Sequence, residues 1–147
     1  MSKKCKKQVA SIMNRLYSKG LTTTSGGNVS MRNGNKVYIT PSQTDKGNMK
    51  ASQVGILTME GRNLTPKLKP SMESKMHLAV YSARPDIKSI VHAHPFTATA
   101  LSATNNLIDS SINGEARAII GEIQFTEYQT MGTHDLAKTV ANATIYG

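Results

Sequence analysis

The tripeptide His92-Ala93-His94 is the short segment of this 147-residue chain whose side chains are best suited to metal binding or catalysis. It follows the apolar pair Ile90-Val91, and the alternation of side-chain character predicts a strand. Because successive side chains of a strand point to opposite faces, both imidazoles are expected on one face. A catalytic zinc takes about three protein ligands and keeps one position open, so two imidazoles would supply part of such a site. An ordinary half-exposed strand is the competing interpretation.

Glu73 is a second residue that could take part in catalysis, and His77 follows it by four residues. Residues at this spacing share one face of a helix, so these two side chains could join the histidine pair in one cluster. Glu73 can serve as a general acid or base, although a carboxylate in a first helical turn is also favoured by the helix dipole alone. For His77, packing beneath the sheet is the simpler interpretation. Glu115 and Tyr128 lie in predicted loops, and no pattern singles out either.

Three short segments indicate an anion-binding site. In the segment Ser25-Gly-Gly-Asn-Val-Ser30, paired glycines allow backbone amides to approach an anion closely. Thr40-Pro41-Ser42 follows a predicted strand, and Pro70-Ser71 precedes a predicted helix, whose free amides and positive dipole end favour a phosphate. A plain glycine turn and a capping serine without a ligand are the alternatives.

The elements that must position these residues follow from hydrophobic periodicity and from turn residues. Helices are expected over 4–18, with Gly20 as its cap, from Ser71 to Pro85, from Pro95 to Leu101, and from Thr133 onward. Strands are expected over 29–32, 36–40, 54–58, 88–94 and 118–125, with Asn33-Gly34 as a hairpin turn. This order predicts a mainly antiparallel sheet covered by helices, in an α+β or three-layer α/β/α arrangement.

The composition limits the possible classes of protein. The length favours one domain, and no apolar stretch approaches the roughly 20 residues of a membrane span. Cys5 is the only cysteine, which excludes an internal disulfide and suits a reducing cytoplasm. The net charge of +9 favours phosphorylated small molecules or polyanions. Nucleic acid is not an expected partner, because the basic residues are scattered and few aromatics accompany them.

Taken in order, these motifs resemble the class II aldolase/adducin N-terminal family, whose founding activity is that of L-fuculose-phosphate aldolase. The similar segments cover nearly the whole chain: residues 25–30, 39–42 with Asp45-Lys46, 69–73, 76–81, 84–86, 91–95, 121–123, and Gly132-Thr133 with Leu136-Ala137. The resemblance implies a three-layer α/β/α fold with a mainly antiparallel sheet. It also implies a homo-oligomer, usually a tetramer, with active sites at subunit interfaces.

The resemblance implies a role for each candidate residue. His92 and His94 match two of three histidines that hold zinc or another divalent metal, and Glu73 matches the acid/base glutamate. The residues expected to hold the substrate phosphate are Gly27, Asn28, Ser42 and Ser71, with Glu115 a possible additional site residue. The implied reaction cleaves a short ketose phosphate, similar to L-fuculose 1-phosphate, into dihydroxyacetone phosphate and an aldehyde through a zinc-stabilised enediolate.

Two departures from the family pattern leave alternatives open. The third histidine of the family lies in a later Asn-His-Gly or His-His-Gly motif, which is not found before Gly147. His134 does not match a ligand position, and Met72 stands where some members have a second hydroxyl. Residues 1–147 are therefore interpreted as one aldolase-like domain, C-terminally incomplete relative to the family. The alternatives are a dehydratase or epimerase acting on a phosphorylated ketose, an inactive adducin-like interaction module, and a truncated non-catalytic fragment.

Overall fold

The computed structural model describes residues 2–104 and 108–146 of the chain. One four-stranded sheet with the order β3-β2-β1-β4 lies at its centre, and every neighbouring pair is antiparallel. The strands are β1 (Asn28–Asn33), β2 (Lys36–Ile39), β3 (Gly55–Thr58) and β4 (Ser89–His92). The pairing of β1 with β4 sets Asn28 opposite His92, so these two side chains share one face of the sheet.

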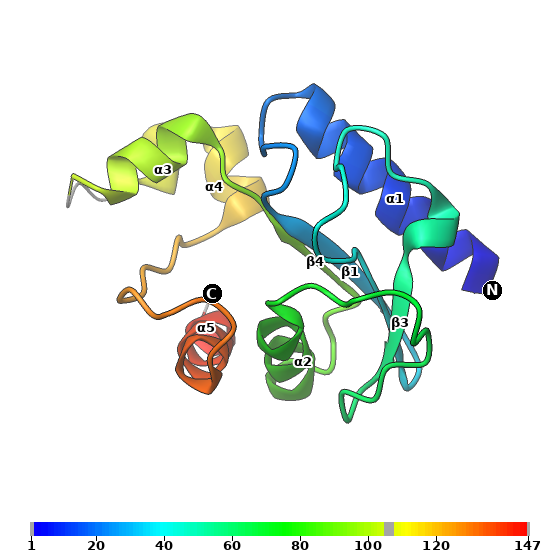
Figure 1. Cartoon of the computed structure of the whole chain (residues 1–147). Coiled ribbons are helices and arrows are strands. Elements are labelled where there is room, and N and C mark those ends of the chain that lie inside the picture. The colour runs from blue at the N-terminus through cyan, green and yellow to red at the C-terminus, as the bar shows by residue number, and fades with distance from the viewer. Residues whose placement is uncertain (1, 105–107, 147) are drawn as a thin grey trace.

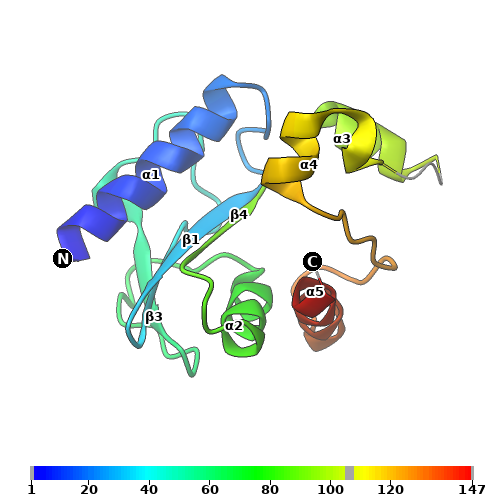
Figure 2. The same cartoon turned by 180° about the vertical axis from the view of Figure 1, so that it is seen from behind.

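Helices cover both faces of the sheet, which confirms the predicted three-layer α/β/α fold (Figures 1 and 2). α1 (Ser2–Ser18) lies on one face, and α2 (Ser74–Ala83) and α5 (His134–Tyr146) lie side by side on the other. The shorter helices α3 (Phe96–Ser102) and α4 (Gly114–Ile120) lie beyond one end of the sheet. Two single-turn 3-10 helices, Ala51–Gln53 and Ser110–Ile112, complete the elements. Among the described residues, no helix has both the length and the apolar character needed to cross a membrane.

Strand alternation divides the hydrophobic core into two clusters. Val29 packs in a cluster with Val9 and Met13 of α1, whereas Ile39 packs in the second cluster with Tyr81 of α2. Along β1, this alternation turns Asn28 and Ser30 toward α2, and both are buried. Buried polar side chains require hydrogen-bond partners, so the α2 face of the sheet must supply them close to the histidine strand.

Local turn chemistry fixes the ends of α1 and of the β1–β2 hairpin as the sequence predicts. Gly20 has a φ of 68°, and the amides of Gly20 and Leu21 donate to the carbonyls of Tyr17 and Leu16, which is a Schellman cap. Gly34, with a φ of 58°, begins the two-residue loop between β1 and β2.

Two predicted elements differ in the structure. Residues 118–125 are not a strand, because α4 extends to Ile120 and Gly121, at a φ of 73°, ends it. Asn113 starts this helix by accepting a hydrogen bond from the amide of Ala116, a local signal that outweighs the apolar run. Ser71 is not the N-cap of α2, which begins at Ser74; the Ser71 carbonyl instead accepts the Ser74 amide in a turn that precedes the helix.

Candidate active site

A cavity of about 300 Å³ lies where β1 begins and β4 ends, next to the start of α2. It collects the predicted site residues Gly27, Asn28, Ser42, Ser71, Glu73, His92 and His94. They come from four separate segments of the chain, so the fold, rather than sequence proximity, creates the site. A larger groove of about 910 Å³ runs along α2 and α5, but its walls include neither Glu73 nor the histidine pair.

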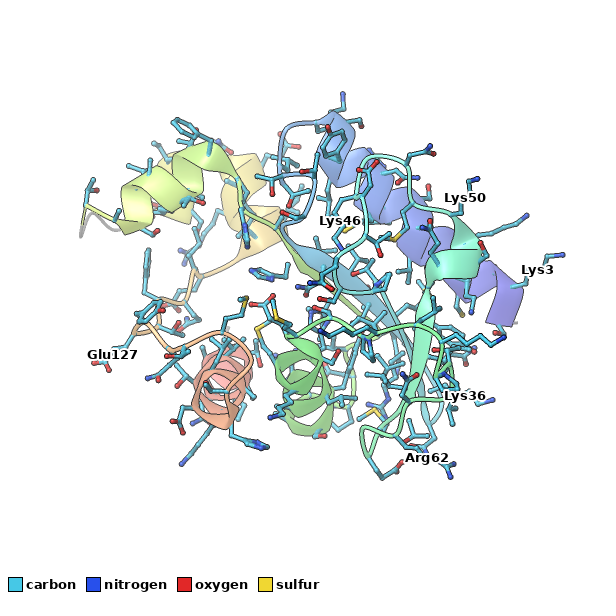
Figure 3. All side chains as sticks on the ribbon, viewed as in Figure 1. Lys3, Lys36, Lys46, Lys50, Arg62 and Glu127 are labelled. Atoms are coloured by element: carbon cyan, nitrogen blue, oxygen red, sulfur yellow. The ribbon has the colours of Figure 1, made fainter. Side chains whose placement is uncertain are left out.

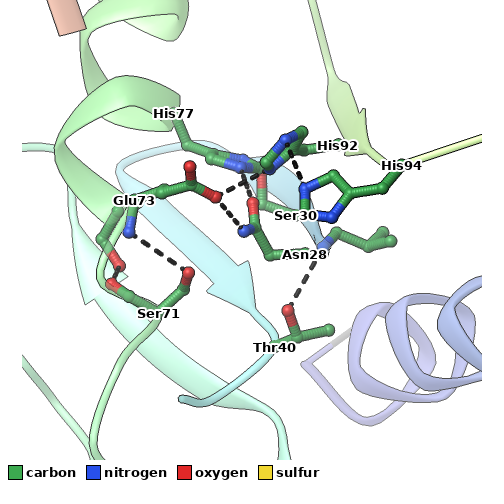
Figure 4. Close-up of polar contacts among 10 residues, drawn as sticks. Asn28, Ser30, Thr40, Ser71, Glu73, His77, His92 and His94 are labelled. Atoms are coloured by element: carbon green, nitrogen blue, oxygen red, sulfur yellow. Dashed lines mark hydrogen bonds and ion pairs between the residues drawn. The ribbon is translucent and has the colours of Figure 1, made fainter. Parts of the chain in front are cut away.

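His92 and His94 form one end of this cavity. Their Nε2 atoms lie 3.2 Å apart and their ring centroids 4.8 Å apart, which confirms that the two imidazoles share a face (Figure 4). Two nitrogens bound to one tetrahedral zinc lie about 3.3 Å apart, given Zn–N distances near 2.0 Å. The observed separation therefore fits a shared divalent metal, and it also suits a hydrogen bond from one ring to the other.

The Glu73 carboxylate orients His92. Glu73 Oε2 lies 2.7 Å from His92 Nδ1 and accepts a 2.6 Å hydrogen bond from Asn28 Nδ2. Burial raises the pKa of Glu73, but the hydrogen bonds from His92 and Asn28 outweigh it, and the pKa lies below its usual value. An ionised carboxylate only accepts hydrogen bonds, so the Nδ1 atom of His92 that faces it carries a hydrogen, and Nε2 is the ring nitrogen directed at His94. A carboxylate in this position raises the basicity of a metal-binding imidazole.

A chain of buried hydrogen bonds supports Glu73 from beneath (Figure 4). His77 Nε2 lies 2.5 Å from Asn28 Oδ1, His77 Nδ1 lies 2.7 Å from Ser30 Oγ, and Ser30 Oγ lies 2.8 Å from the Tyr81 hydroxyl. Because Asn28 donates to Glu73, its oxygen must accept from His77 Nε2, and His77 Nδ1 must then accept from Ser30. The direction of every bond follows from the ionised state of Glu73.

Burial keeps the members of this chain uncharged. His77 is fully buried, and burial, followed by the nearby His92, lowers the pKa of His77 to about 4. Burial raises the pKa of Tyr81 to about 12. At neutral pH both groups are therefore fixed dipoles.

This network gives Asn28 a second role besides the expected one. The resemblance placed Asn28 among residues that hold a phosphate, but both ends of its amide are engaged, with Glu73 on one side and His77 on the other. Its side chain positions the carboxylate, and the second hydrogen of its Nδ2 is left for another acceptor, so the expected contact of Asn28 with a phosphate stays a prediction. The same network places His77 beneath the cluster, where it contacts Asn28 and not the imidazole pair.

The paired glycines allow the start of β1 to pack against the histidine segment. A Cβ atom on Gly26 would lie 3.0 Å from His94 Nδ1, and one on Gly27 would lie 2.7 Å from the His92 carbonyl oxygen. Gly27 also has a φ of 66°, a conformation that side chains disfavour. The glycines therefore have a packing role at the imidazoles in addition to any anion contact.

The opposite end of the cavity carries hydroxyl groups and a cation. Ser42 and Ser71 line the cavity there, and so does Gln43, which follows Ser42. Gln43 has a φ of 54°, the only positive value at a non-glycine residue in the described part of the chain. Lys46 also lines this end and is almost completely buried. Reasoning from the sequence missed Lys46 as a site residue, although the pair Asp45-Lys46 belongs to the motif that carries the resemblance.

Three further residues lie outside this arrangement or at its margin. Glu115 is exposed on α4 and is not among the residues that line the cavity, so the structure gives its possible site role no support. Tyr128 lines the cavity from a loop but is 89% exposed. His134 lies at the start of α5 and lines the larger groove instead.

Over residues 2–104 and 108–146, no group of three or more His, Cys, Asp or Glu side chains is arranged to hold a metal ion. The described residues therefore offer two imidazole ligands, with Glu73 acting on His92 from behind. A metal at this position would complete its coordination with water, substrate or a donor outside these residues.

Comparisons with known proteins place the chain in a family. Residues 7–146 match the model of the Class II Aldolase and Adducin N-terminal domain. The L-fuculose phosphate aldolase of Methanocaldococcus jannaschii is 33% identical over 136 residues, which cover 92% of this chain and 74% of that protein. The 3-oxo-tetronate 4-phosphate decarboxylase of Haemophilus influenzae is 33% identical, over 89% of this chain and 64% of its own length.

The fold agrees with the sequence relationship. A solved structure of L-fuculose 1-phosphate aldolase superposes with a TM-score of 0.83 and 30% identity, covering 97% of this chain and 68% of the other. The chain belongs to the Class II Aldolase and Adducin N-terminal domain family. Its family and aldolase relatives identify it as an enzyme of the lyase class, as the resemblance in the sequence implied.

Proposed function

We propose that this protein is a divalent-metal-dependent aldolase that cleaves a short phosphorylated ketose to dihydroxyacetone phosphate and an aldehyde. The observation that carries the proposal is the placement of an imidazole pair, an ionised carboxylate and a hydroxyl-lined end around one cavity. These are the groups that retro-aldol cleavage of a sugar phosphate requires: a site for a Lewis acid, a proton acceptor and an anion anchor. A substrate similar to L-fuculose 1-phosphate agrees with the names of the relatives.

His92 and His94 are the residues that would hold the metal, through Nε2 of each ring. Their 3.2 Å separation and the contact of His92 Nδ1 with the Glu73 carboxylate support this assignment. A divalent ion such as zinc, when bound there, supplies Lewis-acid stabilisation of the negative charge that develops on the substrate oxygen.

Glu73 acts as the acid/base residue at Oε1 and Oε2. Its depressed pKa keeps it ionised at neutral pH, ready to accept the proton of a substrate hydroxyl as the carbon–carbon bond breaks. The protonated carboxyl then returns a proton to the three-carbon product. Asn28 holds the carboxylate in place during both steps, because its amide is itself fixed by His77.

Ser42, Ser71 and the backbone around Gly27 form the proposed phosphate end. Ser71 lies in the turn before α2, and its hydroxyl accepts a 3.3 Å hydrogen bond from the Glu73 amide, so it ties the phosphate end to the catalytic carboxylate. A phosphate held there would place the ketose between Ser71 and the imidazole pair, which converts phosphate binding into orientation of the reacting carbons.

The test is product analysis with the purified chain. Incubation with ketose 1-phosphates and zinc should release dihydroxyacetone phosphate, measured by its enzymatic reduction, together with one equivalent of aldehyde. Glu73→Gln should lower this release by about 10²- to 10⁴-fold while leaving the fold intact. Absence of dihydroxyacetone phosphate from every ketose phosphate tested, with metal present, would contradict the proposal.

A decarboxylase is the second candidate, because the Haemophilus influenzae relative carries that name at the same 33% identity. Loss of carbon dioxide from a phosphorylated 3-oxo acid also leaves negative charge on a carbonyl oxygen, so the same metal and phosphate ends would serve it. The two reactions differ in their products. Carbon dioxide released from a 3-oxo acid phosphate, without aldehyde from ketose phosphates, would favour the decarboxylase.

The proposal extends to assembly as a homo-oligomer. The segments around α3 and α4 expose large apolar side chains, including Phe96 and Ile112 at 83% each and Ile119 at 74%. Large exposed apolar side chains are typical of surfaces that other protein chains cover. Analytical ultracentrifugation should show a species larger than 15.9 kDa, which Ile119→Asp should shift toward the monomer.

A further inference from the structure

Lys46 is a buried cation that forms an ion pair with no carboxylate among the described residues. It is 2% exposed, whereas Lys3, Lys36 and Lys50 project outward from the surface (Figure 3). Within the part of the chain that the structure describes, the carboxylates that form ion pairs are Asp86, with Arg84, and Glu73, with His92; none pairs with Lys46. Buried charges in proteins are normally paired, because an isolated ammonium loses its hydration without compensation.

The backbone holds Lys46 firmly in this position. Its amide donates to the Thr24 carbonyl at 2.9 Å, and its Nζ donates to the Pro41 carbonyl at 2.7 Å. Lys46 thus joins the loop that carries Gly26 and Gly27 to the loop that carries Ser42. An ammonium group has three hydrogens, and the bond to Pro41 uses one. Two donors remain at a residue that lines the cavity.

The surroundings of Lys46 suit a phosphate more than any other anion. The lining of the same cavity includes the hydroxyls of Ser42 and Ser71 and the backbone beside Gly27, which are hydrogen-bond donors without negative charge. A phosphate dianion has three free oxygens, which can accept from several such donors and from an ammonium at once. Burial lowers the pKa of Lys46, because an ammonium that loses water without gaining a counter-charge is destabilised.

We infer that Lys46 is the charged residue that binds the phosphate group of the substrate and selects phosphorylated sugars over unphosphorylated ones. This inference deepens the proposed function and rests on it for the identity of the sugar, but the anion site itself can be tested without catalysis.

The experiment uses inorganic phosphate as the probe and the full chain as the protein. Isothermal titration calorimetry in a buffer free of other phosphates and sulfates should show saturable binding to the wild type. Lys46→Met should weaken this binding about ten- to a hundredfold, because a hydrogen bond to a charged group is lost. Lys36→Met removes the same charge from an exposed strand position and should leave the affinity unchanged. Equal affinity in Lys46→Met and the wild type, or no binding by the wild type, would overturn the inference.

Lys46→Met could fail to fold, since it removes the bond to Pro41, and two further measurements guard against this. Lys46→Arg keeps the charge and should retain more phosphate affinity than Lys46→Met. In the wild type, NMR of the lysine side chains should show one ammonium that titrates below the ordinary range and whose pKa rises when phosphate is added. A Lys46 signal unaffected by phosphate would also overturn the inference.

The outcomes separate this inference from the proposed reaction. Phosphate binding that depends on Lys46, without aldolase or decarboxylase activity, would support the anion site and contradict the proposed function. Cleavage of a ketose phosphate whose kcat/KM is the same in Lys46→Met would do the reverse. If both hold, Lys46→Met should raise KM for the phosphorylated ketose by a larger factor than it raises KM for an unphosphorylated ketose.

Discussion

The two ends of the cavity solve opposite electrostatic problems. At the imidazole end, a buried carboxylate is satisfied by His92 and Asn28, and its pKa falls below the usual value because hydrogen bonds outweigh burial. At the phosphate end, Lys46 is buried without a counter-charge, and its pKa is lowered by burial alone. Described residues satisfy the hydrogen bonds of the Glu73 carboxylate at one end, whereas no described carboxylate pairs with Lys46 at the other.

This difference indicates how function is divided between the two ends. The imidazole end is preorganised: each hydrogen bond from Tyr81 to Glu73 has one possible direction, so little rearrangement is needed when a proton moves. At the phosphate end, a bound phosphate would supply the negative charge that Lys46 lacks, and this suits the end to substrate binding. Substitutions at the first end should therefore reduce turnover, and substitutions at the second should reduce affinity.

The largest expected effect comes from removing one imidazole. His92→Ala should reduce cleavage to background and lower zinc affinity by more than about 100-fold, the upper range for losing an outer-shell partner, because a direct ligand is lost. Metal content by elemental analysis after dialysis, together with aldehyde release, measures both effects. His134→Ala, at an exposed histidine on α5, is the matched control. Full activity and metal content in His92→Ala would mean that the pair is not the metal centre.

Glu73→Gln should lower kcat by about 10²- to 10⁴-fold, the usual contribution of a general acid or base. KM should change little, because the amide keeps the shape of the carboxylate and the phosphate end is untouched. Steady-state kinetics with a ketose phosphate measures the two parameters separately, and Glu122→Gln, at an exposed position, is the control. A raised KM with unchanged kcat would assign Glu73 to binding and remove the contrast between the two ends.

The buried network should make folding sensitive to acid through His77. Its pKa is about 4 in the folded protein, below the unfolded value of 6.5, so the unfolded state binds the proton first as pH falls. The free energy of unfolding should therefore be unaffected by this group above pH 6.5 and fall by about 1.4 kcal/mol per pH unit between 6.5 and about 4. Urea unfolding at pH 7, 6 and 5 measures this slope.

Two variants make the acid sensitivity specific to His77. His77→Gln should reduce the slope, while His134→Gln, which alters an exposed imidazole, should keep it. If His77→Gln retains the full slope, another group causes the loss of stability in acid, and the network does not hold His77 neutral.

Ser71→Ala should have the smallest effect. Loss of one hydroxyl contact to phosphate should reduce kcat/KM for a phosphorylated ketose by about three- to tenfold, mainly through KM. As a control, Ser82→Ala at an exposed position of α2 should leave kcat/KM unchanged. An equal loss for an unphosphorylated ketose would indicate that Ser71 acts through the turn at Glu73 instead of through the phosphate.

Much of the fold could be predicted from local patterns, and the failures have identifiable causes. Alternation at Val91-His92-Ala93-His94 correctly predicted that the two imidazoles lie together, although β4 ends at His92 instead of His94. Gly20 and Asn33-Gly34 marked real turns. The apolar residues at 118–120 could belong to either a strand or a helix, and the Asn113 cap decided for the helix. A short apolar run does not by itself distinguish the two.

The sequence by itself determined which chemical groups are present and which share a local face: the histidine pair, the Glu73 and His77 spacing and the glycine turn at the start of β1. Only the tertiary structure decided that Asn28 serves Glu73, that Lys46 is buried at the phosphate end and that Glu115 lies outside the cavity. The physical reason is that burial and hydrogen-bond partners come from distant segments. Asn28 is hydrogen-bonded to Glu73, 45 residues later in the sequence, and to His77, 49 residues later. Local periodicity cannot predict contacts at such separations.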